Sequence, residues 1–200
     1  SLVGGSIGDQ VGVTGITALT NGNYVVRSAF WGGGASATAA SSKGAITWGS
    51  GTLGISGVLS NSNSLVGSAA GDDVGSGTVT ALSNGNAVAL SPLWGSGDGT
   101  TANAKGAATW INGLIGVNGI LDSSDINSFV GTTTGDQIGA GGAAVSALLD
   151  GRALLSSPKW NGSGATLTGR VDILGPAVPL AMTPTVGFSA NASTTSKFVV

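Results

Sequence analysis

The sequence predicts an all-β fold built from three tandem repeats. One sequence motif occurs three times, beginning at Ser1, Ser64 and Ser128, so the repeat period is about 63 residues. Glycine occurs 37 times and glutamate never, and no apolar helical pattern runs for three turns without a glycine. A unit of this size cannot bury an apolar face alone, so it packs on its neighbours. We therefore expect repeats at residues 1–63, 64–127 and 128–200, the last with a divergent stretch at 176–200.

Each unit begins with an aspartate in a glycine loop, followed by a short strand and a turn. The expected first strands are Ile16–Leu19, Val79–Leu82 and Val145–Leu148. An Asn-Gly or Asp-Gly pair then follows, at Asn21-Gly22, Asn84-Gly85 and Asp150-Gly151. Such pairs favour a type I′ turn, because both central residues must adopt positive φ. Each unit is therefore expected to contain a tight antiparallel hairpin.

The second arm of each hairpin leads to a tryptophan, and further strands follow. In the last two units this arm ends at Ser91-Pro92 and Ser157-Pro158, where proline cannot donate to a sheet ladder. The expected third strands are Gly44–Trp48, Gly106–Trp110 and Gly169–Ile173. A fourth strand is expected before or within the Ser-Leu-Val-Gly phrase, where residues 53–59 recur as residues 115–121.

Two architectures can accommodate about four short strands per unit. In the first, each unit is a four-stranded antiparallel blade, as in a propeller, and three blades form an open arc. In the alternative, a β-solenoid, the units are coils of a parallel helix. The predicted hairpins favour blades, because parallel coils do not need tight reversals.

Composition excludes several classes of function. Only 8% of the residues are charged and the formal net charge is −2, which argues against nucleic acid or an anionic membrane as a partner. Cysteine and histidine are absent, so disulfides, thiolate metal sites and histidine catalysis are excluded. No run of residues approaches the ~20 apolar residues of a membrane span. We expect a noncatalytic chain, and its Gly, Ser, Thr, Asn and Ala richness is typical of bacterial extracellular and cell-surface proteins.

The repeated phrases resemble two groups of proteins. The GDxVG loop, the hairpin, Ser-Pro-x-Trp and Gly-Ala-x-Thr-Trp, in tandem over almost the whole chain, resemble repeats of large bacterial surface proteins of the filamentous-haemagglutinin-like adhesin type. More distantly, their order resembles the FG-GAP blade of integrin-type β-propellers. That resemblance implies a four-stranded blade with an aspartate-rich calcium loop. Here Asn21-Gly22-Asn23 and its equivalents are too short and too poor in carboxylates to hold calcium, so no cofactor is expected.

Asp9, Asp72 and Asp136 are the candidate metal ligands. They recur at one place in each unit and could line a cation or sugar site on one face of the array. The alternative is an Asx turn, in which the carboxylate bonds to nearby backbone and shapes the glycine loop.

Trp31, Trp94 and Trp160 are the candidate ligand-binding residues. A periodic row of indole rings could stack on a glycan, but the same recurrence fits packing between units. Trp48 and Trp110 alternate with Ile46 and Ala108 along a strand and are expected in the core.

The chain finishes with an apolar segment containing Phe198, Val199 and Val200. Such a segment can pair with an open sheet edge, in the same chain or in the next subunit, and non-closing contacts of the second kind produce filaments. The expected partners are neighbouring repeats, copies of the chain, and glycans or a cell surface. The preferred function is a structural or adhesion module, and the alternative is a lectin-like carbohydrate-binding module.

Overall fold

The computed structural model describes residues 1–140, 144–161 and 168–175, and these residues form strands, turns and loops without a helix. The prediction of an all-β repeat fold is confirmed. The first unit contributes β1 (Leu2–Val3), β2 (Gly15–Ala18), β3 (Tyr24–Arg27), β4 (Ala45–Gly49) and β5 (Gly57–Val58). The second contributes β6 (Leu65–Gly67), β7 (Val79–Ala81), β8 (Ala87–Ser91), β9 (Ala107–Ile111) and β10 (Gly119–Leu121). The third contributes β11 (Ser128–Val130), β12 (Ala144–Ala147), β13 (Ala153–Ser157) and β14 (Arg170–Leu174).

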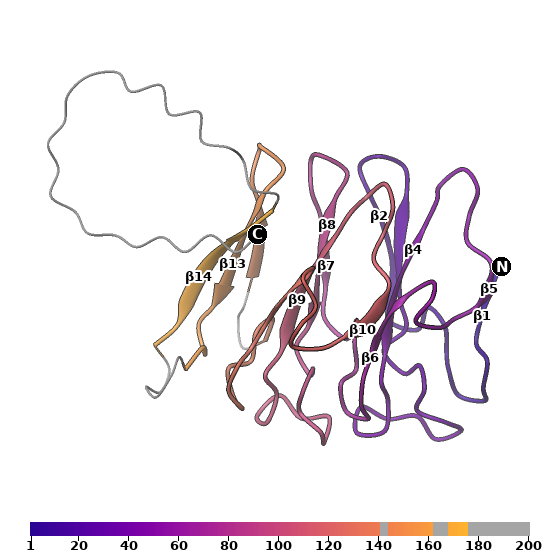
Figure 1. The fold of residues 1–200 in the computed structure, drawn as a ribbon, viewed down its shortest axis with the longest axis horizontal. Coiled ribbons are helices and arrows are strands. Elements are labelled where there is room, and N and C mark those ends of the chain that lie inside the picture. Colours follow the sequence, from indigo (N-terminus) through magenta and orange to yellow (C-terminus); the bar gives the residue numbers. More distant parts are fainter. Residues whose placement is uncertain (141–143, 162–167, 176–200) are drawn as a thin grey trace, which may run out of the picture.

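The described residues form three main sheets and a two-stranded pair of β1 with β5. The first sheet has the order β10-β6-β4-β3-β2, the second β11-β9-β8-β7, and the third β12-β13-β14. Figure 1 shows them standing side by side in a row, from β1 and β5 near the N-terminus to β13 and β14 at the other end. The array is therefore an open stack of blade-like sheets.

The strand that completes a sheet comes from the next unit. The Ser-Leu-Val-Gly strand β6 pairs antiparallel with β4, and its equivalent β11 pairs antiparallel with β9. Two other strand pairs are parallel: β5 pairs with β1, and β10 pairs with β6. The Ser-Leu-Val segment and the apolar segment before it thus both form strands. The first and second sheets each contain strands from two successive repeats.

The hairpins are confirmed, but the expected type I′ turn is wrong. Glycine at the second turn position has positive φ, 87° at Gly22, whereas Asn21 is not among the residues with positive φ. Leu19 N–H donates to Asn23 O at 2.8 Å, so the loop holds three residues rather than two. The Asn21 carboxamide oxygen accepts the Asn23 N–H at 3.1 Å, which stabilises this longer loop. The side chain of asparagine, rather than its tolerance of positive φ, is what the turn uses.

The core lies between the sheets. The middle strand β8 is buried on both faces: Ala87 and Ala89 pack in the cluster shared with the first sheet, and Val88 and Leu90 in the cluster shared with the third. This explains why the second arm of the hairpin is apolar throughout, since a strand between two sheets has no solvent face. Trp48 and Trp110 pack against these clusters on the same faces as Ile46 and Ala108.

Candidate functional site

The recurring aspartates are buried and bound to backbone. The Oδ2 atom of Asp72 accepts the N–H groups of Ser68 and Ala69, both at 2.8 Å, and Oδ1 accepts the N–H of Gly95 at 3.0 Å. Asp9 receives equivalent bonds from Gly5, Ser6 and Gly32, and Asp136 from Thr132, Thr133 and Asn161. Each carboxylate therefore ties the segment after a closing strand to the loop that follows the tryptophan. A charge-assisted bond of this kind is about twice as strong as a neutral one.

These contacts define what the aspartates can do. Every carboxylate oxygen of the three residues accepts a backbone N–H, and the three side chains belong to three different units. Within the described ranges, no group of three or more His, Cys, Asp or Glu side chains is placed to hold a metal ion. The arrangement is thus a repeated carboxylate staple inside each unit.

The residue after each staple aspartate has a positive φ, which is unusual for a residue other than glycine. Gln10, Asp73 and Gln137 are the described non-glycine residues with positive φ, at 42°, 41° and 50°. Lys159 donates to the Gln137 carboxamide oxygen at 3.0 Å. In the second unit leucine precedes the tryptophan in place of this lysine, and the buried oxygens of Asp73 have no hydrogen-bond partner. Burial, followed by the charge of Asp72, raises the pKa of Asp73 to about 7.

Sequence reasoning missed Asp73 as a buried acid. The available signal was its replacement by glutamine at the same place in the other two units. That pattern shows that the position accepts a neutral side chain, but burial of the carboxyl depends on how the sheets stack.

The three hairpin tryptophans have different environments. Trp94 is 7% exposed, and its indole N–H donates to Leu121 O at 3.1 Å. Trp31 is half-buried against the cluster of Ala45, Leu59 and Val66. Trp160 is also half-buried, with the Arg170 guanidinium 5.2 Å from the centre of its ring. The row of tryptophans therefore contributes to packing between units, and only its first and last members present part of a ring to solvent.

A shallow hollow lies beside Trp31. It has a volume of about 230 Å³ and is lined on its polar side by Lys43, Ser60, Asn61 and Ser68. An aromatic ring next to hydroxyl, amide and ammonium groups can contact both the apolar and the polar faces of a small polar ligand. The predicted binding residue Trp31 is itself part of the wall of this hollow.

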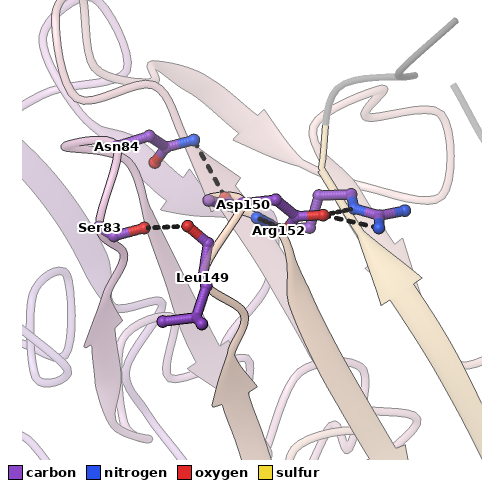
Figure 2. Close-up of polar contacts among 6 residues, drawn as sticks. Ser83, Asn84, Leu149, Asp150 and Arg152 are labelled. Atoms are coloured by element: carbon purple, nitrogen blue, oxygen red, sulfur yellow. Dashed lines mark hydrogen bonds and ion pairs between the residues drawn. The ribbon is translucent and has the colours of Figure 1, made fainter.

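The hairpin turns of successive units are stacked and hydrogen-bonded. Asn84 Nδ2 donates to Gly151 O at 3.0 Å, and Ser83 Oγ donates to Leu149 O at 3.4 Å (Figure 2). One unit earlier, Thr20 Oγ1 donates to Leu82 O at 2.7 Å, and Asn21 Nδ2 to Gly113 O at 2.8 Å. Sequence reasoning used these residues as turn formers only, and their role as links between units appears only in the stack.

The third turn breaks the series. Asp150 replaces the asparagine, and its carboxylate pairs with Arg152 of the same turn at 2.6 Å (Figure 2). A carboxylate has no N–H to donate to a carbonyl of a further unit.

The predicted assembly residues Phe198, Val199 and Val200 lie outside the described residues. The described part of the chain contains no long apolar helix of the kind that crosses a lipid bilayer.

The model of a family described as a repeat of unknown function, DUF5650, matches residues 18–76 and 81–140, more than half of the chain. The chain belongs to this family. The first DUF5650 match begins at the last residue of β2 and includes the closing strand β6 and the staple aspartate Asp72. The second match includes β11 and Asp136. The family repeat thus contains the strand that completes its own sheet. Neither a curated protein nor a solved structure matches the chain.

Proposed function

We propose that this DUF5650 protein is a noncatalytic structural or adhesion module on the outside of a bacterial cell. The main support for the proposal is that the recurring polar side chains bind the chain's own backbone. The staple aspartates bind backbone within each unit, and the turn asparagines bind the next unit. A scaffold needs such uniform internal contacts in every unit, whereas a catalyst needs one distinct site.

Composition and resemblance support the location. The chain has few charges and no cysteine, and its phrases resemble those of filamentous-haemagglutinin-like surface repeats. The blade-like sheets also agree with the more distant resemblance to FG-GAP blades.

Surface labelling tests this proposal directly. Antibodies raised against the purified chain should label intact cells that produce the protein, and external protease should remove the signal. Labelling that requires lysis of the cells would contradict the extracellular location. A fluorescent cytoplasmic protein in the same cells is the control for intactness.

The hollow at Trp31 supports a second candidate, carbohydrate binding. A half-buried indole beside Asn61, Ser60 and Lys43 offers a stacking surface and polar groups that suit a sugar ring. A glycan array should then give a signal with the wild-type chain that Trp31→Ala lowers at least tenfold. Trp160→Ala is the matched control, because this half-buried tryptophan lies at the equivalent position of the third unit. An equal effect of both substitutions, or no glycan signal, would contradict a site at Trp31.

A further inference from the structure

The two ends of the stack carry complementary parts of a sheet. The first sheet, β10-β6-β4-β3-β2, combines three strands of the first unit with two strands of the second. At the N-terminal end of the stack, β1 and β5 form a pair by themselves, and at the other end β12, β13 and β14 form a sheet of three (Figure 1). The two groups of strands that make up the first sheet are therefore also present separately, at opposite ends of the described molecule.

The free edges of these two groups have the geometry of a strand pair that the molecule already contains. β1 pairs with β5 in the same parallel register as β6 pairs with β10. The other edge of β6 pairs antiparallel with β4. Among the described residues, no strand occupies the corresponding edge of β1 or the corresponding edge of β14, which is the equivalent of β4 in the third unit.

A polar contact accompanies this strand pair wherever it is formed. Thr47 Oγ1 lies 2.6 Å from Ser64 Oγ, and Thr109 Oγ1 lies 2.8 Å from Ser128 Oγ. In both contacts the threonine belongs to the third strand of a unit, and the serine opens the Ser-Leu-Val or Ser-Phe-Val segment of the next unit. The third unit has Asp172 at the threonine position.

Asp172 lacks the partner that the two threonines have. Its side chain is 14% exposed, and its Oδ1 atom is bound by Arg170, at 2.7 Å from Nε and 2.6 Å from the terminal nitrogen. Its buried Oδ2 atom has no hydrogen-bond partner, which costs free energy. Ser1 opens the first Ser-Leu-Val segment, so in the register of the other sheets its hydroxyl would lie opposite Asp172 and could donate to this oxygen.

The outer face of the first unit is apolar and hollowed. A hollow of about 270 Å³ on this face is lined mainly by apolar side chains, among them Leu2, Val11 and Ile16. The equivalent residues of the second unit pack against the first unit in the shared core, and these are Leu65, Val74 and Val79. The first unit thus exposes the face that the second unit buries.

The outer face of the third unit carries the matching apolar positions. Ile46 and Trp48 of β4 are the first-unit residues that pack in that shared core. Their equivalents on β14 are Val171 and Ile173, which are 68% and 56% exposed. Both sides of an interface found inside the chain are therefore repeated, without a described partner, at its two ends.

We propose that a second copy of the chain docks head to tail, with its β1 pairing antiparallel with β14 and its Ser1 hydroxyl donating to Asp172. The combined sheet then has the order β5-β1-β14-β13-β12, which repeats the arrangement of β10-β6-β4-β3-β2. Contacts between unlike ends leave one free head and one free tail, so further copies can add and extend the stack. This inference goes beyond the proposed function, and it holds whether or not the module lies on a cell surface.

One difference from the internal interfaces predicts a weaker contact. The turns of the first and second units donate through Asn21 and Asn84 to carbonyls of the next unit. Asp150 has the equivalent position in the third unit and has no N–H to donate. We therefore expect reversible association that increases with the concentration of the chain.

Mixing two single-cysteine variants tests the strand pair, because the chain has no cysteine of its own. Ser1→Cys and Asp172→Cys, purified separately and mixed under mild oxidation, should give a disulfide-linked dimer on a non-reducing gel. Ser6→Cys mixed with Asp172→Cys is the out-of-register control, since Ser6 is also exposed. We expect at least about tenfold more dimer from the first mixture, because docking raises the effective concentration of the two thiols.

The double variant Thr109→Cys with Ser128→Cys is the positive control, because it places both thiols at the equivalent pair within one chain. It should lose its free thiols and run as a monomer. If this control is oxidised and the test mixture gives no more dimer than the Ser6→Cys mixture, the edge of β14 does not accept a second copy and the proposal is overturned.

Blocking one face at a time tests the direction of docking. Sedimentation velocity of the wild-type chain should show species that grow with concentration, whereas Ile16→Lys and Ile173→Lys should each be monomeric alone. An equimolar mixture of these two variants should form dimers but nothing larger, because each retains one intact face. A monomeric wild type at every concentration, or a mixture that stays monomeric while the wild type associates, would overturn head-to-tail docking.

Discussion

At the residue scale, the most informative side chains are the staple aspartates. Their recurrence was visible in the sequence, but two interpretations were open, a ligand site or a local turn. The structure places each carboxylate among three backbone N–H groups, one of them from a loop that follows the next tryptophan. Their main contacts are with backbone, which accounts for the presence of one staple in every unit.

Asp72→Asn tests this role. An amide has one acceptor oxygen, so at least one buried N–H loses its partner and the free energy of unfolding should fall by about 1–3 kcal/mol. The measurement is urea unfolding followed by tryptophan fluorescence. Asp98→Asn is the control, because this exposed carboxylate binds only nearby Thr100 and Asn103. A chelator that lowered the wild-type midpoint as much as the substitution would indicate a metal ligand instead.

Asp73 predicts a specific pH dependence. Its carboxyl has a pKa of about 7 in the folded chain against 3.8 for the ordinary group, so the folded state binds more protons between these values. The contribution of Asp73 to the free energy of unfolding is therefore fully present below pH 3.8 and is lost as the pH rises through about 7. Asp73→Gln should raise the melting temperature at pH 8 and remove this part of the pH dependence.

The test compares melting temperatures of the wild type and Asp73→Gln from pH 4 to pH 8. Gln10 and Gln137 show that glutamine is accepted at this position. Leu93→Lys is a second variant, since lysine at the matching position of the third unit binds Gln137. It should raise the wild-type stability at pH 8. A constant difference between wild type and Asp73→Gln over the whole range would contradict the raised pKa.

At the scale of the elements, the hairpin turns have two tasks. They reverse the chain and they link one unit to the next. An added Cβ at Gly151 would lie 2.3 Å from the Asn84 amide nitrogen, whereas one at Gly22 would meet nothing within 4 Å. Both glycines have nearly the same positive φ, 83° and 87°.

Gly151→Ala and Gly22→Ala therefore form a matched pair. Both variants incur the same backbone strain, but only Gly151→Ala displaces Asn84 and breaks its bond to the next turn. We expect it to cost about 1 kcal/mol more than Gly22→Ala. Urea unfolding of both variants measures the difference, and equal losses would mean that the link between turns contributes nothing to stability.

At the scale of the whole molecule, the position of a unit in the stack decides the role of equivalent residues. Ile16 and Val79 occupy the same place in the first strand of their units. Ile16 is 67% exposed on the outer face of the first sheet, whereas Val79 packs in the cluster between the first and second sheets.

Ile16→Lys and Val79→Lys test this dependence. Lysine at position 79 brings a charge into an apolar contact, so we expect it to lower the free energy of unfolding by at least about 1 kcal/mol more than lysine at position 16. Urea unfolding and light scattering of both variants provide the comparison. A large loss at position 16, or a smaller particle size than the wild type, would show that another unit covers this face in solution.

The amino-acid sequence was sufficient to predict the all-β repeat fold, the hairpins and the strands that follow them. These features depend on local chemistry: glycine and asparagine at turns, proline after a strand, and apolar runs of strand length. The predicted type I′ turn was nevertheless wrong, because the geometry of the turn depends on the hydrogen bond from Asn23 N–H to the Asn21 side chain.

Three features could be learned from the folded molecule alone: which strand completes the first and second sheets, what the staple aspartates bind, and which tryptophan rings are covered. These contacts join residues of different units or distant loops, such as Asp72 with Gly95 and Trp94 with Leu121. A repeated sequence assigns equivalent residues the same local conformation. Their burial depends on whether a neighbouring sheet lies on each face, and that is a property of the stack.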